Sequence, residues 1–179
     1  YSLESGIVLV RGFVKNNYIG RTFIKPDQSA RQEAVTIKLN PIRSSVEGKR
    51  VVMIDDSIVR GTTIAKIVTM LKACGAKEVH VRISAPPFLY PCYYGTDVPS
   101  GDRLIARKHT IPQICELIGA DSLGYLRADS LDEMISEPGH HFCDACFTGH
   151  YPNAMTGINT GGSGKEDLSQ EFCQGLAAQ

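Results

Sequence analysis

The chain has 179 residues, of which 42% are apolar, and its 19 basic and 19 acidic side chains give a net charge of zero. A neutral chain has no general attraction for nucleic acid or for an anionic membrane surface, so we expect neither as a partner. No apolar run approaches the roughly 18 residues of a membrane-spanning helix, and no signal peptide is recognisable. We therefore expect a cytoplasmic protein with one domain-sized core.

The first six residues have the pattern of a helix end. The chain begins with Tyr1 instead of Met, and Gly6 stands where a C-cap glycine would end a helix. We interpret the sequence as an incomplete polypeptide.

Strand and loop patterns follow in the first third of the chain. Residues 7–13 form a short β-branched run that predicts a strand. Residues 15–38 are polar and basic, and a loop of this length is commonly a lid or a binding loop. Residues 51–54, Val-Val-Met-Ile, form an unbroken apolar run, which predicts a strand buried on both faces.

A strand, a helix and a second strand are predicted next. Apolar residues recur at helical spacing from 64 to 71, with Thr62 or Thr63 as the candidate N-cap and Gly75 as the end. Residues 79–83 have the composition of the next strand. This order implies a parallel sheet with a right-handed crossover, and hence an α/β fold.

The second half of the chain has weaker signals. Residues 104–106 predict one more short strand, and residues 111–118 predict a helix that Gly119 closes. A third short helix is predicted at 131–135. After Pro152 the sequence turns to Asn, Thr, Gly and Ser, which is typical of a flexible tail.

The strongest chemical signal is a nine-residue segment, here called the diphosphate-sugar loop, between the predicted strand 51–54 and the helix after it. Its members are Asp55, Asp56, Ser57, Ile58, Val59, Arg60, Gly61, Thr62 and Thr63. Backbone N–H groups at a helix start and the helix dipole favour a bound anion. Gly61 permits close backbone approach, and Arg60 adds positive charge.

The two adjacent carboxylates narrow the kind of ligand. Asp55 and Asp56 would repel a phosphate, but they suit sugar hydroxyls, a divalent cation or a developing positive charge. A ribose 5-phosphate with a 1-diphosphate offers all three. We therefore predict that these acids hold the ribose hydroxyls directly or through Mg²⁺, and that residues 57–63 hold the 5-phosphate.

Two other phosphate-binding patterns are absent. The sequence contains neither the P-loop pattern Gly-x-x-x-x-Gly-Lys-[Ser/Thr] nor Gly-x-Gly-x-x-Gly. The complete segment, four apolar residues followed by the diphosphate-sugar loop, resembles the signature of type I phosphoribosyltransferases.

The basic loop before this segment indicates one family among the type I phosphoribosyltransferases. Its composition alone would favour a solvated loop, but residues 15–24, with Gln28 and Arg31, are similar to the closing loop of the glutamine phosphoribosylpyrophosphate amidotransferase family. Further segments resemble the same family in order over residues 1–152. They are residues 48–53, 84–87, 93–97 and 118–123.

The resemblance implies a fold and a division of the chain. It implies the parallel-sheet α/β fold of type I phosphoribosyltransferases, incomplete at the N-terminus, with a C-terminal cysteine-containing extension. We expect a partial phosphoribosyltransferase domain at 1–128, a helical Cys-x-x-Cys segment at 129–152 and a tail at 153–179.

The resemblance also implies an activity. Members of the family join phosphoribosyl diphosphate and glutamine-derived ammonia into 5-phosphoribosylamine and diphosphate, the first committed step of purine biosynthesis. Tyr18 and Arg21 match catalytic residues of the closing loop, and Lys38 matches its flank. The ammonia would come from an N-terminal glutaminase domain outside this chain, so we expect no glutamine hydrolysis by the chain alone. Purine nucleotides as feedback inhibitors and a homo-oligomer are further expectations.

Two of the six cysteines form the segment Cys143-Asp144-Ala145-Cys146, and Cys92 lies upstream in a Pro-Cys-Tyr-Tyr-Gly context. A long chain with a core and no signal favours thiols or metal ligands over disulfides. Spacing alone leaves three readings open for the pair: a metal site, which zinc with nearby histidines would also fit, a redox pair, or ordinary thiols. A thioredoxin-type motif would open a helix after a strand, which we do not expect here.

The family resemblance assigns a cofactor to these cysteines. One branch of the family holds a structural [4Fe–4S] cluster on four cysteines, three of which match Cys92, Cys143 and Cys146. The fourth ligand lies outside this chain, so we expect an incomplete site. Cys115, by contrast, lies on the apolar face of its predicted helix and is expected to be a core thiol.

Two other functions compete with the amidotransferase. One is a regulator that binds phosphoribosyl diphosphate without catalysis, and the other is a base-salvage phosphoribosyltransferase. The complete closing loop with Tyr18 and Arg21 favours the enzyme over the regulator. We recognise no nucleobase-binding hood in the sequence, which disfavours base salvage.

Overall fold

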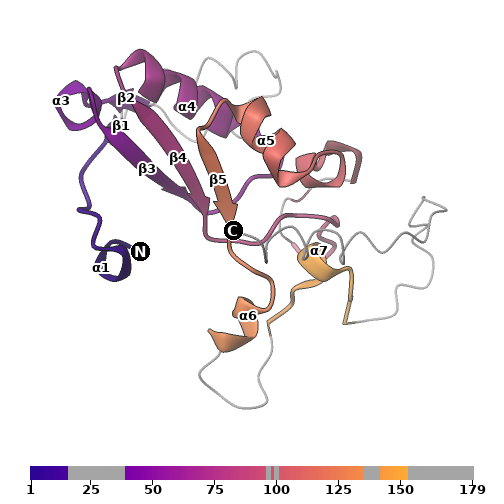
Figure 1. Cartoon of the computed structure of the whole chain (residues 1–179). Helices are drawn as coiled ribbons and strands as arrows, with labels where there is room; N and C mark the ends of the chain where they lie inside the picture. Colours follow the sequence, from indigo (N-terminus) through magenta and orange to yellow (C-terminus); the bar gives the residue numbers. More distant parts are fainter. Residues whose placement is uncertain (16–38, 96–97, 99–100, 135–141, 153–179) are drawn as a thin grey trace.

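A computed structural model describes residues 1–15, 39–95, 98, 101–134 and 142–152 of the chain. Its centre is a three-stranded parallel sheet of β3 (Arg50–Asp55), β4 (Glu78–Ile83) and β5 (Ser122–Tyr125), with the strand order β3-β4-β5 (Figure 1). The predicted α/β fold is confirmed, and so is the parallel pairing of the strands predicted at 51–54 and 79–83, which are β3 and β4. The third strand, β5, was not predicted.

Two amphipathic helices cover one face of the sheet. They are α4 (Thr62–Ala73) and α5 (Ile111–Ile118), and each turns its apolar side chains inward. The central strand β4 alternates strictly, with Val79, Val81 and Ile83 buried under the helices. The fully buried side chains of this core include Leu71, Val68, Val79, Val81 and Ile114.

The edge strand β3 is less buried than its sequence predicts. Val51 and Met53 pack against the core, but Ile54 on the opposite face is 49% exposed, so burial on both faces is wrong. Within the described residues β3 pairs with β4 alone. Among the described residues the second face of this strand is only partly covered, since Val52 is half-buried and Ile54 is exposed.

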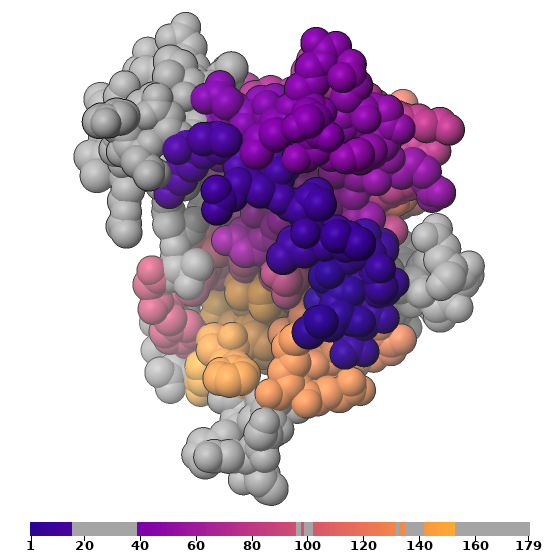
Figure 2. Space-filling view, turned by 90° about the vertical axis from the view of Figure 1, so that its left-hand side faces the viewer, coloured from indigo at the N-terminus to yellow at the C-terminus, as the bar shows by residue number. Residues whose placement is uncertain are grey.

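The N-terminal segment lies on the outside of the molecule (Figure 2). The short helix α1 (Ser2–Ser5) ends at Gly6 with φ 69°, as predicted. The strand predicted at 7–13 is wrong, because β1 covers only Phe13–Lys15 and pairs antiparallel with β2 (Leu39–Pro41). Val8 and Leu9 are 78% and 81% exposed, and β-branched propensity without a neighbouring strand did not produce pairing.

Short helices connect the larger elements. After β2, α3 (Arg43–Val46) buries Val46 in the core. The strand predicted at 104–106 is wrong, since two 3₁₀ turns, η2 (Gly101–Arg103) and η3 (Ile105–Arg107), occupy this region. Leu104 and Ala106 are nevertheless buried, which explains their apolar character.

Two further short helices follow the sheet, and both lie beyond the carboxyl ends of its strands in Figure 1. They are α6 (Ser130–Glu133), at the predicted third helix, and α7 (Ala145–Thr148). The predicted tail 153–179 and most of the predicted basic loop, 16–38, lie outside the described residues. No helix in the described part of the chain has the length and apolar character needed to cross a membrane.

Candidate functional site

The carboxyl end of β3 delivers Asp55 to the edge of the sheet where parallel α/β proteins bind ligands. In the ladder Asp55 lies opposite Ile83, and Ile83 lies opposite Tyr125, so the three strands end together. Asp55 shares a strand face with Val51 and Met53, the side covered by helices, which explains why its side chain is half-buried.

The two carboxylates lie in different surroundings. The backbone N–H of Asp56 donates to Asp55 Oδ1 at 3.0 Å, and the Ser57 hydroxyl donates to Asp56 Oδ1 at 2.9 Å. Burial raises the pKa of the Asp55 carboxyl above its ordinary value, and the nearby charge of Asp56 adds to the rise while the Asp56 N–H opposes it. Asp56 itself is exposed. A cation or sugar hydroxyls bound here would therefore contact a half-buried carboxylate, Asp55, and an exposed one, Asp56.

The start of helix α4 differs from the predicted cap. The N-cap residue is Gly61 with φ 77°, and no side chain caps the helix, so the predicted cap by Thr62 or Thr63 is wrong. Both threonines are exposed, and Ile58 anchors the preceding turn with 3% of its surface exposed. A helix start without a side-chain cap leaves its first N–H groups available to an anion.

The structure gives a reason for a glycine at position 61 that differs from the predicted one. We predicted that it permits close approach of a ligand, but its nearest neighbour is the side chain of Ile105 in η3. A Cβ at position 61 would stand 2.8 Å from Ile105 Cδ1, and φ 77° is itself a conformation that side chains disfavour. The Ile105 N–H also donates to the Val59 carbonyl at 2.9 Å. The turn η3 thus contacts the diphosphate-sugar loop twice, by side-chain packing at Gly61 and by a hydrogen bond at Val59.

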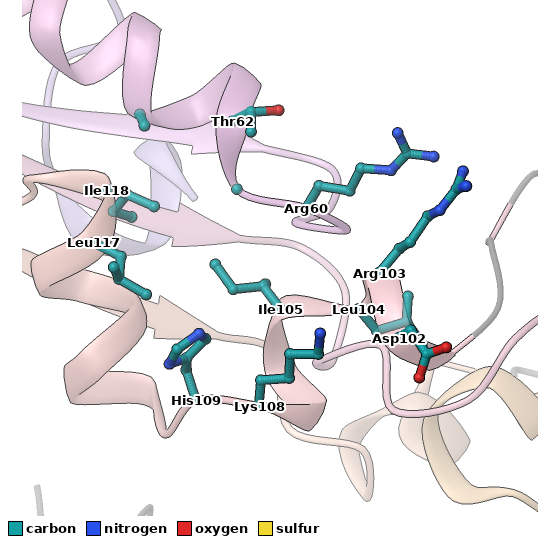
Figure 3. A pocket seen from close by; sticks show the side chains of 12 residues that line it. Arg60, Thr62, Asp102, Arg103, Leu104, Ile105, Lys108, His109, Leu117 and Ile118 are labelled. Carbon is teal, nitrogen blue, oxygen red and sulfur yellow. The ribbon is translucent and has the colours of Figure 1, made fainter. Parts of the chain in front are cut away.

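A pocket of about 350 Å³ opens beside the loop (Figure 3). It is lined by Arg60, Gly61 and Thr62 from the loop, and by residues of α4, η2, η3 and α5. Neither Asp55 nor Asp56 lines it. The pocket therefore adjoins the predicted ligand site without containing the two carboxylates.

The predicted closing-loop residues lie outside the described residues. They are Tyr18, Arg21 and Lys38, and so are Gln28 and Arg31. The structure brings together Asp55, Asp56 and residues 57–63, while the roles of the closing loop stay predictions.

Known proteins match this chain closely. The profile of the phosphoribosyl transferase domain matches residues 12–86, which include β3, the diphosphate-sugar loop, α4 and β4. Amidophosphoribosyltransferase 1, chloroplastic, of Arabidopsis thaliana is 48% identical over 158 residues, which are 88% of this chain and 28% of that protein. The amidophosphoribosyltransferase of Archaeoglobus fulgidus is 48% identical over 159 residues, covering 88% of this chain and 35% of that protein.

A solved structure agrees in fold. The glutamine phosphoribosylpyrophosphate amidotransferase from B. subtilis, complexed with ADP and GMP, is 49% identical and superimposes with a TM-score of 0.70 over 85% of this chain and 34% of that one. The chain belongs to the amidophosphoribosyltransferase family. It carries a type I phosphoribosyltransferase fold, and it spans about a third of the length of these relatives.

The three cysteines assigned by family resemblance lie near one another in this amidophosphoribosyltransferase portion. Cys146 lies in α7 and, with Cys92, packs against the small core of Phe88, Val98 and Leu104. Burial raises the pKa of the Cys146 thiol to about 11, and the nearby thiols of Cys92 and Cys143 add to the rise. The described residues nevertheless contain no three Cys, His, Asp or Glu side chains placed to hold one metal ion.

The Cys-x-x-Cys segment adjoins a short helix. Asp144 is the N-cap of α7, so the motif straddles the helix start, which we did not expect. In the described residues the element before α7 is the helix α6, so the strand of a thioredoxin-type motif is not seen there. Cys115 is half-buried on α5, and its thiol donates to the Ala120 carbonyl at 3.3 Å, in keeping with a packing role.

Sequence reasoning missed several residues of the pocket beside the loop. Arg103, Lys108 and His109 line it, although they lie about 45 residues beyond the loop in the chain. The run Arg107-Lys108-His109 was the available signal. Only the fold, which sets η3 against Gly61, shows that this run lies near the loop.

Proposed function

We propose that this chain provides the transferase reaction of an amidophosphoribosyltransferase. The reaction converts phosphoribosyl diphosphate and glutamine-derived ammonia into 5-phosphoribosylamine and diphosphate, the first committed step of purine biosynthesis. The observation that supports this most is the pair Asp55 and Asp56 at the end of β3, followed directly by the uncapped start of α4. Its family relatives carry the name of this enzyme.

Each part of the loop has a proposed role. The first N–H groups of α4 and the hydroxyls of residues 57–63 hold the 5-phosphate, because they offer donors without a competing side-chain cap. Arg60 is exposed and adds positive charge to the loop. Asp55 and Asp56 hold the ribose hydroxyls.

Mg²⁺ fits the same two carboxylates. Their oxygens are the hard ligands that this ion prefers, and the raised pKa of Asp55 is what a sheltered carboxylate without a bound cation would have. Bound there, Mg²⁺ would neutralise part of the diphosphate charge. The ion and its ligands are part of the proposal.

The chemical step requires charge stabilisation more than proton transfer. The ammonia nitrogen forms a bond to C1 of the ribose while the bond from C1 to the diphosphate oxygen breaks. The nitrogen then loses a proton to solvent. Positive charge develops on the sugar ring as the bond from C1 to the diphosphate breaks, and the carboxylates of Asp55 and Asp56 are proposed to stabilise it. Tyr18, Arg21 and Lys38 of the closing loop are proposed to cover the site and exclude water.

An iron–sulfur cluster is a second part of the proposal. Three thiolates, from Cys92, Cys143 and Cys146, would bind it with a fourth ligand from outside the chain. The support is that these thiols are close enough to raise the pKa of Cys146. As they stand the described side chains do not form a metal site, so the fit depends on rearrangement around α7. Because one ligand comes from outside the chain, we expect iron and sulfide to be absent or labile in the purified chain. A stoichiometric, air-stable cluster on this chain would contradict the incomplete site.

Further partners follow from the family. We propose ammonia supply by a glutaminase domain, feedback inhibition by purine nucleotides, a homo-oligomer and a cytoplasmic location. The support for nucleotides is that the B. subtilis relative was solved with ADP and GMP.

Phosphoribosyl diphosphate binding tests the proposal directly. Calorimetric titration into the 179-residue chain with Mg²⁺ should show one site, and Asp55→Asn should weaken it at least about tenfold because charge-assisted contacts are lost. Asp129→Asn is the matched control, since that exposed carboxylate pairs with Arg127, is not a residue of the loop and should leave the affinity unchanged. Equal affinity of wild type and Asp55→Asn would overturn the assignment. Binding without turnover when ammonia is supplied would favour the regulator.

A further inference from the structure

Two cysteine-bearing segments of the chain contact each other directly. They are residues 88–94, here called the cysteine loop, and residues 143–151, which contain α7. The backbone N–H groups of Leu89 and Tyr90 both donate to the Cys146 carbonyl at 3.0 Å, although more than 50 residues separate the donors from the acceptor. A carbonyl that accepts two N–H groups uses both of its lone pairs. These hydrogen bonds fix α7 against the cysteine loop.

Ring contacts continue the same interface. The Phe88 ring packs against the Phe147 ring of α7, with centroids 5.0 Å apart. The Tyr90 ring lies against Gly149, the C-cap of α7, where an added Cβ would stand 2.9 Å from Tyr90 Cζ and where φ is 81°. A glycine is therefore needed at position 149, because the Tyr90 ring occupies the space of a side chain.

Tyr151 contacts the cysteine loop on both sides of Cys92. Its hydroxyl donates to the Pro91 carbonyl at 2.7 Å. Its ring packs against the rings of Tyr93 and Tyr94, with centroids 5.2 Å and 6.3 Å away. Aromatic pairs at such separations stabilise a contact beyond the area that they bury. Cys92 therefore lies between two points of the loop that Tyr151 holds.

The Cys92 sulfur takes part in the same arrangement. The Tyr94 N–H donates to Cys92 Sγ at 3.4 Å, so the residue whose ring packs on Tyr151 also contacts the thiol. Cys92 and Cys146 pack against one small core, which consists of Phe88, Val98 and Leu104. We propose that Tyr151 is a positioning residue, which holds the cysteine loop against α7 and thereby keeps Cys92 near Cys146.

The contacts between the two segments are all made by protein groups, since they consist of hydrogen bonds and packed rings. Docking of α7 on the cysteine loop therefore does not require a bond from a thiolate to a metal, and we expect it to persist when metal ions are chelated. Ligation by Cys92 would then start from segments that are already in contact. That consequence rests on the proposed cluster, whereas the docking itself does not.

Amide hydrogen exchange of the 179-residue chain in EDTA, followed by NMR, tests the docking. The N–H groups of Leu89 and Tyr90 report it directly, because both donate to Cys146. Tyr151→Phe removes the hydroxyl and keeps the ring, so exchange at both amides should be about three- to tenfold faster than in wild type. Unprotected amides at these two positions in wild type would refute the docking. Unchanged exchange in Tyr151→Phe would refute the role of the hydroxyl.

Tyr125→Phe is the matched control. The Tyr125 hydroxyl is buried and has no hydrogen-bond partner in the described part of the chain, so its removal breaks no hydrogen bond there. Exchange at Leu89 and Tyr90 should stay at the wild-type rate. An equal acceleration in both phenylalanine variants would mean that loss of a tyrosine hydroxyl destabilises the fold in general, and it would overturn the local role of Tyr151.

Alkylation in EDTA tests the positioning of Cys92. Iodoacetamide labelling, mapped by mass spectrometry, should modify Cys92 at least about threefold faster in Tyr151→Phe than in wild type, because each opening of the loop exposes the sulfur. Cys115 is half-buried on α5, in neither segment, and should be labelled at the same rate in both chains. A rise at both cysteines would indicate general unfolding and contradict a positioning role. An unchanged rate at Cys92 would refute the positioning of this residue.

Tyr151→Ala separates the ring from the hydroxyl. It removes the packing on Tyr93 and Tyr94 as well as the hydrogen bond, so both the amide exchange and the labelling of Cys92 should be faster than in Tyr151→Phe. Equal rates in the two variants would overturn the contribution of the ring contacts.

Discussion

Gly61 and Ile105 are in such close contact that a Cβ on residue 61 would stand 2.8 Å from Ile105 Cδ1. The contact joins the start of α4 to η3, two elements separated by more than 40 residues in the chain. It holds the turn of the diphosphate-sugar loop against η3. The glycine in this motif therefore serves packing, while its role in phosphate approach stays a prediction.

Gly61→Ala should destabilise the fold through two effects. The added methyl clashes with Ile105, which typically costs about 1 to 3 kcal/mol, and φ 77° costs a further 1 kcal/mol or so for a side-chain-bearing residue. We expect the free energy of unfolding, measured by urea denaturation, to fall by about 2 to 4 kcal/mol. A loss below about 0.5 kcal/mol would show that the contact does not exist in solution.

Ile105→Val separates these two effects. Valine lacks Cδ1, so the double variant should be less destabilised than the sum of the single variants by about 1 kcal/mol. The cost of the positive φ stays in both backgrounds. Strict additivity would mean that backbone strain alone explains the effect of Gly61→Ala.

Asp55→Asn should stabilise the protein at neutral pH while it weakens phosphoribosyl diphosphate binding. The pKa of Asp55 is raised chiefly by burial, so the folded chain holds its proton more tightly than the unfolded chain. The resulting stability is complete below the ordinary carboxyl pKa and is lost as pH rises through the folded value, leaving a cost at pH 7. Asparagine removes that cost.

Thermal unfolding at two pH values measures this effect. The unfolding midpoint of Asp55→Asn should exceed that of wild type at pH 7, and the two midpoints should converge near pH 3. Asp56→Asn is the matched control, because the Asp56 carboxylate is exposed and should shift the midpoint less. A lower midpoint for Asp55→Asn at pH 7 would mean that hydrogen bonds to the carboxylate outweigh its desolvation.

Elements that depend on the sequence within one helix or strand were predicted from its local pattern. The apolar period of α4, the Gly119 end of α5 and the strand at 79–83 were predicted from the local sequence, and the structure reproduces them. The apolar run 51–54 predicted a strand but overstated its burial, because the number of neighbouring strands is not encoded within the run. Residues 7–12 do not form the predicted strand for the same reason, because the presence of a partner strand is not encoded within the run.

The candidate site was predictable only in part. The position of Asp55 at the end of a strand was predicted correctly, because an apolar run that ends in acids before a helix leaves little choice of position. The roles of Asp55 and Asp56 in binding stay predictions. The pocket was not predictable, since Arg103 and Lys108 reach it from turns whose position depends on the packing of Ile105 against Gly61. Residues 104–106 were predicted to form a strand because they are apolar, yet in the structure they stand at a 3₁₀ turn that also buries Leu104 and Ala106.

Asp121 should contribute to stability through the backbone of β4. Its carboxylate accepts the Val79 N–H at 2.7 Å and pairs with Lys72 at 3.2 Å, and these contacts, with the backbone N–H first, lower its pKa. Asp121→Ala leaves the N–H of a fully buried residue without this acceptor, which should cost about 1 to 3 kcal/mol in the free energy of unfolding.

Lys72→Ala is the control for the ion pair. It removes only a partly exposed salt bridge, so the cost should stay below about 1 kcal/mol. Because the folded pKa of Asp121 is depressed, its contribution is present above the ordinary carboxyl pKa and is lost as pH falls through the folded value. A larger loss in Lys72→Ala than in Asp121→Ala would contradict the backbone role.

The two cysteines of the Cys-x-x-Cys segment should react at different rates in the metal-free chain. Cys143 is exposed, whereas Cys146 is half-buried with a pKa raised to about 11. At pH 8 only about one Cys146 thiol in a thousand is ionised, and the thiolate is the reactive form. Iodoacetamide labelling mapped by mass spectrometry should therefore modify Cys143 first, and the rate at Cys146 should rise nearly tenfold per pH unit between pH 8 and 10. Equal rates at pH 8 would show that Cys146 is neither sheltered nor raised in pKa, and loss of both reactions after iron and sulfide reconstitution would show that the cluster binds both thiols.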